Sequence, residues 1–324
     1  MNTQKTLLNA RKTILVAMLF VLAISAVSCA QPTAEPTKAL PTVAPRATDA
    51  PKPTAAPTVA PTTAPAVFDI KTVLDKYVTA LPDGFGGVQP AALKDQLAAK
   101  PFILDVREAS EIATNGFIEG SVNIPLRTLT KNLDKLPAKD QPIVTLCASG
   151  QRGGIAMSVL QMLGYTNVKN LVGGFGAWKA ANLPVATGTP AEAKAGKAPE
   201  FDKGLFTALD KYVTTLPDGF GGAQPAALKD QMVAAKVFLL DVREPSEITQ
   251  NGFIEGSVNV PTRTLVKNLD KLPRDKAAPI VTYCPSGQRG VIAMTTLQLL
   301  GYTNVKNLVG GFGAWKNANL PIVK

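Results

Sequence analysis

The chain contains one stretch of about 120 residues twice, and this duplication constrains its fold more than any other feature. The sequence LDKYVTALPDGFGG, which begins at Leu74, recurs with one change from Leu209. The sequence GYTNVKNLVGGFGAWK occurs unchanged from Gly164 and from Gly301. Each copy has the length of a typical domain and is much longer than a solenoid repeat. We therefore expect two similar domains in tandem.

Apolar runs and helical periodicity alternate within each copy. Residues 102–106, 142–147 and 167–172 form short apolar runs, and residues 153–163 place apolar side chains at helical spacing. Strands that are apolar on both faces and separated by helices favour a mostly parallel sheet covered by helices. The sequence thus predicts an α/β fold in each copy, with ligands bound beyond the carboxyl ends of the strands.

The first 28 residues resemble an export signal. Lys5, Arg11 and Lys12 precede an apolar run at 14–27, and this run is shorter than the about 20 residues that a membrane-spanning helix needs. The sequence AVSC at 26–29 resembles the lipobox of bacterial lipoproteins, which implies lipidation at the cysteine. A plain secretory signal and an uncleaved anchor are the alternatives. All three place the rest of the chain outside the cytoplasm, so we expect an extracytoplasmic protein that a lipid on Cys29 attaches to the membrane.

The segment that follows is almost wholly Pro, Thr and Ala. It has little to bury and no helix or strand period, and its prolines favour an extended, semi-rigid tether. A stalk that spans a cell wall or carries O-glycans is a compatible interpretation. We predict a signal peptide (1–28), a Pro/Thr/Ala-rich tether (29–66), a first domain (67–187), a linker (188–200) and a second domain (201–324).

Histidine is absent and cysteine is rare, which excludes much catalytic chemistry. The chain has no His and only three Cys, namely Cys29, Cys147 and Cys284. Ser-His-Asp and Cys-His catalysis and the usual zinc sites are therefore excluded, and we expect no metal and no cofactor. The net charge of +10 is spread along the chain without a Lys/Arg cluster, which argues against a nucleic-acid partner.

Two of the cysteines lie in equivalent loops. Residues 147–153 (CASGQRG) and 284–290 (CPSGQRG) each follow a predicted strand and lead into a predicted helix. Backbone N–H groups, the helix dipole and the arginine of the loop should favour a thiolate there. Such a cysteine could act as a nucleophile without a general base. The alternative is an inert buried cysteine, but both loops share Cys, Ser, Gly, Gln and Arg, which packing alone does not require.

Both copies resemble rhodanese (sulfurtransferase) domains. The motifs that carry the resemblance are 105–108, 116–125, 147–153 and 171–178 in the first copy, and 241–244, 252–261, 284–290 and 308–315 in the second. The resemblance implies two five-stranded, mostly parallel α/β domains flanked by helices. It also implies that each loop cysteine takes a sulfane sulfur from a donor, holds it as a persulfide and passes it to a thiophilic acceptor.

This resemblance assigns roles to individual residues. The catalytic residues are Cys147 and Cys284. The predicted substrate-binding residues are Ala148, Ser149, Gly150, Gln151, Arg152 and Gly153, and Pro285, Ser286, Gly287, Gln288, Arg289 and Gly290. The residues predicted to brace the loops from behind, or to form structural ion pairs, are Asp105 with Arg107 and Asp241 with Arg243. The expected partners are thiosulfate, polysulfide or a similar donor, and a thiol or cyanide as acceptor.

The sequence departs from the family at two positions in each copy. Phe117 and Phe253 stand where His is frequent, and Gly153 and Gly290 stand where Ser is common. The first position looks structural, and the second removes a hydroxyl group from the loop but leaves its backbone donors. The remaining loop side chains match neither a thiosulfate nor a mercaptopyruvate pattern, so the donor stays open.

Two other functions remain as alternatives. A Cys-Arg phosphatase or arsenate reductase has one residue more between Cys and Arg than the four found here, and the shorter loop suits a single sulfur atom better. A non-enzymatic rhodanese-like binding module would usually have lost the cysteine, and both copies keep it.

Overall fold

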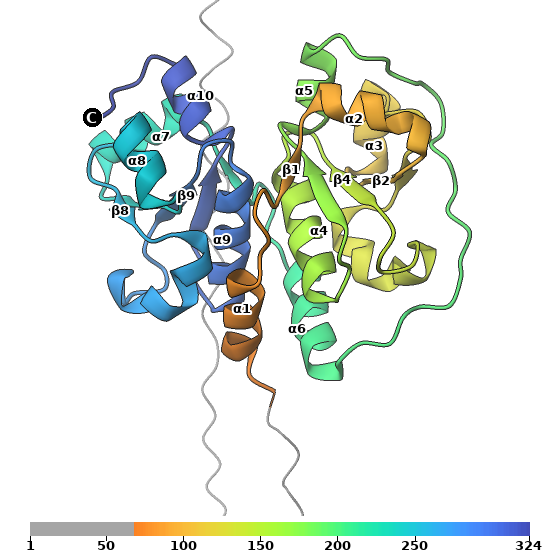
Figure 1. The fold of residues 1–324 in the computed structure, drawn as a ribbon, viewed down its shortest axis with the longest axis horizontal. Coiled ribbons are helices and arrows are strands. Elements are labelled where there is room, and N and C mark those ends of the chain that lie inside the picture. Colours follow the sequence, from red (N-terminus) through yellow and green to blue (C-terminus); the bar gives the residue numbers. More distant parts are fainter. Residues whose placement is uncertain (1–67) are drawn as a thin grey trace, which may run out of the picture. The chain divides into compact units, whose positions relative to one another are not determined.

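The computed structural model describes residues 68–324, which belong to one compact unit. They form two similar α/β domains (Figure 1), called repeat 1 (68–187) and repeat 2 (201–324) below. The predicted signal peptide, Cys29 and the tether to residue 66 lie outside the described residues and stay predictions.

The two repeats have the same succession of elements, except that η1 of repeat 1 has no counterpart in repeat 2; η denotes a 3₁₀ helix. Repeat 1 contains α1 (Ile70–Thr79), β1 (Gly87–Val88), α2 (Pro90–Gln96), η1 (Leu97–Ala99), β2 (Phe102–Asp105), α3 (Ala109–Asn115), β3 (Val122–Asn123), η2 (Leu126–Lys135), β4 (Ile143–Leu146), α4 (Gln151–Met162), β5 (Val168–Leu171) and α5 (Gly174–Ala180). Repeat 2 contains α6 (Lys203–Thr214), β6 (Gly222–Ala223), α7 (Pro225–Ala234), β7 (Phe238–Asp241), α8 (Pro245–Asn251), β8 (Val258–Asn259), η3 (Thr262–Lys271), β9 (Ile280–Tyr283), α9 (Gln288–Leu299), β10 (Val305–Leu308) and α10 (Gly311–Asn317).

Each repeat is built on a parallel five-stranded sheet. The strand order is β1-β5-β4-β2-β3 in repeat 1 and β6-β10-β9-β7-β8 in repeat 2. The central strands β4 and β9 are buried at all four positions, as expected for strands covered on both faces. The predicted α/β fold with parallel five-stranded sheets is confirmed. The helix predicted at 153–163 begins two residues earlier, at Gln151, so the cysteine loop is shorter than the sequence suggested.

Each sheet has one private core and one shared core. In repeat 1 the private core contains Leu93 of α2 together with Phe175 and Trp178 of α5. The indole Nε1 of Trp178 donates to the carbonyl of Pro184 at 2.7 Å, and Trp315 repeats this bond to Pro321 at 2.8 Å. The opposite faces of both sheets contribute to a single apolar cluster that continues from one repeat into the other. The two repeats therefore fold around common apolar surface.

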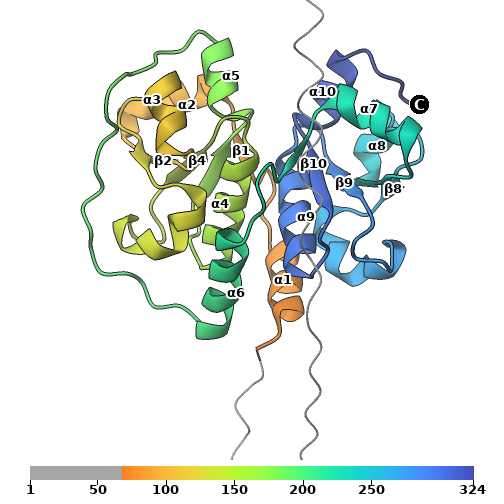
Figure 2. The same cartoon turned by 180° about the vertical axis from the view of Figure 1, so that it is seen from behind.

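Helices α4 and α9 meet in the centre of this shared core (Figures 1 and 2). Both are buried on nearly every side, unlike an amphipathic surface helix. Their closest approach pairs unlike residues, because a Cβ on Gly154 would lie 2.6 Å from the side chain of Val291. Val291 occupies in repeat 2 the position that Gly154 occupies in repeat 1.

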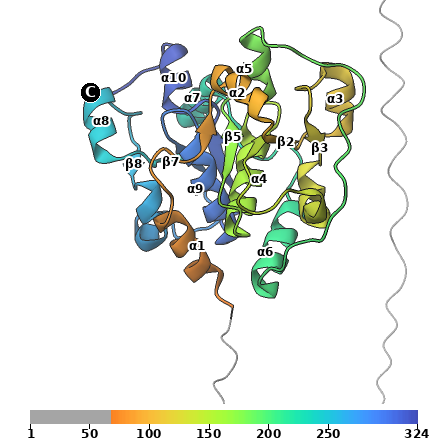
Figure 3. The same ribbon diagram turned by 45° about the vertical axis from the view of Figure 1, so that its right-hand side comes forward.

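The first helix of each repeat packs on the other repeat. Helix α1 contacts η3 of repeat 2, and α6 contacts η2 of repeat 1. Figure 3 shows α1, in orange, beside the blue elements of repeat 2. The hydroxyl of Thr130 on η2 donates to the carboxylate of Asp210 on α6 at 2.6 Å. The chain thus exchanges equivalent helices between its two halves.

The predicted linker runs along repeat 1 before it reaches α6. The backbone N–H of Ala191 donates to the carbonyl of Ser121 at 3.1 Å, and the backbone N–H of Gly196 donates to the backbone carbonyl of Asp134 at 2.7 Å. These bonds hold the linker against the repeat that it leaves. The exact ends of the predicted segments stay predictions.

The exchange of helices predicts that a substitution in repeat 1 destabilises repeat 2. Leu74 on α1 is fully buried in the shared core, so Leu74→Ala should lower the free energy of unfolding by about 2–5 kcal/mol, as measured by urea denaturation. Amide hydrogen exchange should also accelerate in η3, which belongs to the other repeat. Lys71→Ala, on the exposed side of the same helix, is the control. Faster exchange confined to repeat 1 would contradict this account.

Candidate functional site

The two cysteines lie where the sequence placed them, between a central strand and a buried helix. Cys147 follows β4, and Gly150 precedes the first residue of α4 with φ of 88°. Cys284 follows β9, and Gly287 has φ of 89°. Both are free thiols with about 1% of their surface exposed. Each sulfur therefore lies at the amino end of a twelve-residue helix, where backbone N–H groups lack helical partners.

Two carbonyls of each cysteine loop are bound by the last helix of the repeat, α5 or α10. The N–H of Phe175 donates to the carbonyl of Cys147 at 2.7 Å, and the N–H of Gly176 donates to Ala148 at 2.8 Å. In repeat 2 the N–H of Phe312 donates to the carbonyl of Cys284 at 2.7 Å, and the N–H of Gly313 donates to the carbonyl of Pro285 at 2.8 Å. The last helix of each repeat thereby fixes two peptide groups of the cysteine loop.

In repeat 1, one N–H group of the cysteine loop reaches the thiol. The N–H of Gly150 donates to Sγ of Cys147 at 3.2 Å. Contacts to sulfur at this distance are hydrogen bonds, and they strengthen when the acceptor becomes an anion. The loop can therefore solvate a thiolate with its own backbone.

The Gly-Gly pair of the 171–178 motif permits this close packing. Gly174 has φ of +60°, and a Cβ there would lie 2.3 Å from the carbonyl oxygen of Cys147 and 2.6 Å from the nitrogen of Gly150. Gly311 is equally close to Cys284 and Gly287. A side chain at either position would displace the cysteine loop, so the motif is a part of the site.

The glycine that replaces the family's serine also has a packing cause. A Cβ on Gly153 would lie 2.2 Å from Oδ1 of Asn170, and one on Gly290 would lie 2.0 Å from Oδ1 of Asn307. These asparagines are fully buried on β5 and β10. The small residue in the loop makes room for the asparagine behind it.

Each asparagine joins the cysteine loops of the two repeats. Nδ2 of Asn170 donates to the carbonyl of Gly150 and to Oε1 of Gln288, both at 2.8 Å. In the reverse direction, Nδ2 of Asn307 donates to the carbonyl of Gly287 at 3.0 Å and to Oε1 of Gln151 at 2.9 Å. The predicted substrate-binding residues Gln151 and Gln288 are buried and accept these bonds. The amide groups therefore connect the two loops reciprocally.

The loop arginines are ion-paired. Arg152 donates to both carboxylate oxygens of Glu111 at 2.5 and 2.6 Å, and Arg289 donates in the same way to Glu247 at 2.6 Å. The hydrogen bonds from Arg152 lower the pKa of Glu111 against the opposing effect of burial, and Arg289 does the same for Glu247. Each carboxylate stays ionised at neutral pH and offsets the positive charge that the sequence placed beside the cysteine.

The predicted bracing pairs are buried at the carboxyl ends of β2 and β7. Nη2 of Arg107 donates to Asp105 at 2.6 Å and to the carbonyl of Gly116 at 2.9 Å. The guanidinium lies over the ring of Phe175, 4.1 Å from its centroid. The pair thus contacts the residue that donates to Cys147, and not the loop itself. Its role in bracing the loop stays a prediction.

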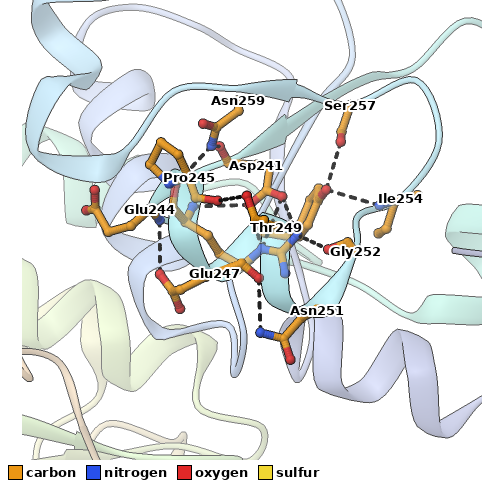
Figure 4. Close-up of polar contacts among 12 residues, drawn as sticks. Asp241, Glu244, Pro245, Glu247, Thr249, Asn251, Gly252, Ile254, Ser257 and Asn259 are labelled. Atoms are coloured by element: carbon orange, nitrogen blue, oxygen red, sulfur yellow. Dashed lines mark hydrogen bonds and ion pairs between the residues drawn. The ribbon is translucent and has the colours of Figure 1, made fainter. Parts of the chain in front are cut away.

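Repeat 2 contains the same pair with an additional tyrosine. Arg243 donates to Asp241 and to the carbonyl of Gly252, and Figure 4 shows Asp241, Gly252 and the α8 residue Glu247 in this cluster. The hydroxyl of Tyr283 donates to Ser257 at 2.8 Å. Burial raises the pKa of Tyr283, and the charge of Asp241 adds to the effect. Leu146 occupies this position in repeat 1, so the two sites differ behind the cysteine.

A pocket lies over each loop. The pocket of repeat 2 has a volume of about 410 Å³ and reaches Cys284, Pro285, Ser286, Gln288 and Arg289. The pocket of repeat 1, with about 340 Å³, is lined by Ser149, Gln151 and Arg152. The structure thus brings these predicted residues together at two openings. Of the other predicted loop residues, Gly150, Gly153, Gly287 and Gly290 are buried, and Ala148 is exposed.

Sequence reasoning missed several residues of the site. They are Glu111 and Glu247, Asn170 and Asn307, and Gly174 and Gly311, together with residues 83–89 and 218–224, which line the pocket of the opposite repeat. All of these residues lie in stretches that the two copies share almost unchanged, and this identity was the available signal. Within residues 68–324, no three Cys, Asp or Glu side chains form a group suited to a metal ion.

Comparison with known proteins agrees with this geometry. The family described as "Rhodanese-like domain" matches residues 89–181 and 224–318, which is more than half of the chain. A protein named sulfurtransferase from Allochromatium vinosum is 39% identical over 87 residues, covering 27% of this chain and 78% of its own length. A thiosulfate sulfurtransferase from Azotobacter vinelandii is 24% identical over 274 residues, covering 71% of this chain and 93% of its own.

Among solved structures, a rhodanese-related protein from Thermoplasma volcanium is 30% identical. The match covers 32% of this chain and 98% of that protein, with a TM-score of 0.29. The family match occurs twice, and each match contains one cysteine loop. The chain therefore belongs to the rhodanese-like sulfurtransferase family and carries two copies of its domain.

Proposed function

We propose that both repeats transfer sulfane sulfur through a persulfide on Cys147 and on Cys284. The thiolate attacks the outer sulfur of a donor such as thiosulfate, and sulfite leaves with the electron pair of the broken S–S bond. The cysteine then holds a persulfide anion. An acceptor such as cyanide or a thiolate attacks the terminal sulfur and regenerates the thiolate, so that charge and sulfur balance over the cycle.

The orientation of the loop backbone carries this proposal. The carbonyls of Cys147 and Ala148 are held by α5, and the N–H of Gly150 already donates to Sγ. A persulfide extends the negative charge by one atom, and neighbouring loop N–H groups offer preorganised donors along that path. Stabilisation by fixed dipoles fits a protein without histidine.

Arg152 and Arg289 have an indirect part in this mechanism. Hydrogen bonding to Glu111 raises the pKa of Arg152, and the adjacent sulfur of Cys147 adds to this effect. The cation contributes to the field at the sulfur, while Glu111 fixes its position and reduces its net charge. We expect such a site to stabilise one sulfur atom better than a highly charged oxyanion.

We also propose that the protein acts outside the cytoplasm as a lipid-anchored sulfurtransferase. The support comes from residues 1–66, with their basic start, apolar run, AVSC sequence and Pro/Thr/Ala-rich segment. Within residues 68–324, every helix is too short or too polar to cross a membrane. A single lipid chain binds a membrane only weakly, so stable anchoring would need more than one acyl chain.

Removal of each cysteine should abolish sulfur loading at its own site. After exposure of the purified protein to thiosulfate or polysulfide, intact mass spectrometry should detect one added sulfur atom per loop cysteine, and cyanide should remove it. Cys147→Ala and Cys284→Ala should each lose one of the two additions, and the double variant should lose both. Circular dichroism of each variant controls for folding. Loading that persists in the double variant would rule out both cysteines.

Crowding of the loop should impair transfer without unfolding the domain. In the Cys284→Ala background, Gly174→Ala should lower the rate of sulfur loading at Cys147 by about tenfold to hundredfold, because the new Cβ collides with the loop. Gly164→Ala is the matched control, since Gly164 also has a positive φ of +90° but its Cβ would meet only the end of Lys139. An equal loss of rate in both variants would attribute the effect to general strain.

Substitution of Cys29 should release the protein from the membrane. Cys29→Ser removes the predicted lipidation site, so the protein should move from the membrane fraction to the soluble fraction, or remain as an uncleaved precursor of higher mass. Incorporation of labelled palmitate in the unsubstituted protein, and its loss in the variant, provides the direct measurement. Equal labelling of both proteins would exclude Cys29 as the lipidated residue.

A further inference from the structure

The pocket over each cysteine loop has an outer wall that comes from the other repeat. The pocket over Cys284 is lined by Asp83, Gly84 and Phe85, which follow α1 in repeat 1. The pocket of repeat 1 is lined by Asp218, Gly219 and Phe220, which follow α6 in repeat 2. We name residues 81–87 and 216–222 the crossing segments. They are the LPDGFGG stretches that both copies share.

An arginine of the receiving repeat fixes each crossing segment. Nε and Nη2 of Arg263 donate to the carbonyl of Leu81 at 3.0 and 2.8 Å, and Nη2 also pairs with Asp83 at 2.7 Å. The guanidinium lies 5.6 Å from the ring centroid of Phe85. The carbonyl of Leu81, the carboxylate of Asp83 and the ring of Phe85 thus all contact the guanidinium of Arg263.

The second crossing segment is held in the same way. Nη2 of Arg127 donates to the carbonyl of Leu216 and to Asp218, both at 2.8 Å, and its guanidinium lies 5.9 Å from the ring centroid of Phe220. The same contacts therefore hold the crossing segment at both sites.

The charges of the Cys284 pocket disfavour a doubly charged donor. Its cations are Arg263 and Arg289, and each is already paired with a carboxylate. A third carboxylate, Glu244, also lines the pocket, which leaves its lining with one more negative than positive charge. A dianion such as thiosulfate would find no unpaired cation there, whereas the ring of Phe85 offers apolar surface to an organic group.

We propose that the crossing segment of repeat 1 (81–87) selects the sulfur donor of repeat 2, favouring small organic persulfides that carry an ammonium group over the thiosulfate dianion. Donor choice rests on the sulfur transfer proposed above, whereas the wall rests on geometry alone. In the step, the thiolate attacks the outer sulfur of R–S–SH, the S–S bond breaks, and R–SH leaves with the proton. The cysteine keeps the persulfide anion, so atoms and charge balance.

The wall can be tested with a neutral and an anionic reagent that need no sulfur transfer. In the Cys147→Ala background, the rates at which iodoacetate and iodoacetamide alkylate Cys284 give a ratio that reports the field in the pocket. Asp83→Asn removes a charge from repeat 1 while Leu81 still holds Arg263. It should raise the iodoacetate-to-iodoacetamide ratio at Cys284 about 1.5-fold to twofold, because the almost fully exposed Asp83 carboxylate is screened by water and salt.

A matched variant controls for net charge. Asp95→Asn makes the same change at an exposed position on α2 of repeat 1 and should leave the ratio at Cys284 unchanged. In the Cys284→Ala background, Asp218→Asn should raise the ratio at Cys147. No change with Asp83→Asn, or an equal change with Asp95→Asn, would overturn the crossing wall.

Donor preference is then measured by intact mass spectrometry. The Cys147→Ala protein should load sulfur faster from cysteamine persulfide, which carries an ammonium group and no carboxylate, than from thiosulfate, and Asp83→Asn should narrow this difference about twofold to fourfold. Faster loading from thiosulfate, or a difference that Asp83→Asn leaves unchanged, would overturn donor selection. Absence of loading from both donors would overturn the proposed sulfur transfer and donor selection with it, while the alkylation ratio would still decide whether the wall crosses between repeats.

Discussion

Hydrogen bonds to a few backbone carbonyls fix the conformation of both cysteine loops. In each repeat, two carbonyls of the cysteine loop accept hydrogen bonds from backbone N–H groups at the start of the last helix, α5 or α10. These bonds fix peptide groups of the loop, and in repeat 1 the N–H of Gly150 donates to Sγ of Cys147 at 3.2 Å. Gly174 and Gly311 permit this close packing, and the ring of Phe175 lies under the guanidinium of the buried Arg107.

Hydrogen bonds also join the cysteine loops of the two repeats to each other. Asn170 and Asn307 each bind a loop carbonyl of their own repeat and the glutamine of the opposite loop. Together with the exchanged helices and the crossing segments, these bonds make each site depend on residues from both halves of the chain. A single copy of this sequence would expose apolar surface of the shared core and leave its pocket open on one side.

The sequence predicted the local structure better than the assembled site. Apolar runs located β2, β4 and β5, and the loops at Cys147 and Cys284 stood out because parallel strands present their carboxyl ends to ligands. It could not reveal that Arg152 is neutralised by Glu111, since the two residues are distant in the chain. Nor could it show that α1 leaves its own repeat, because periodicity describes the buried face of a helix and not the partner that covers it.

The contact between Gly154 and Val291 shows what fusion of the two copies made possible. In a dimer of identical chains, the residue on the symmetry axis meets itself, so two glycines would leave a void and two valines would collide. Here the halves are joined covalently, and one half supplies the protrusion while the other supplies the recess. The duplicated chain has used its freedom from strict symmetry at the place where symmetry is most costly to packing.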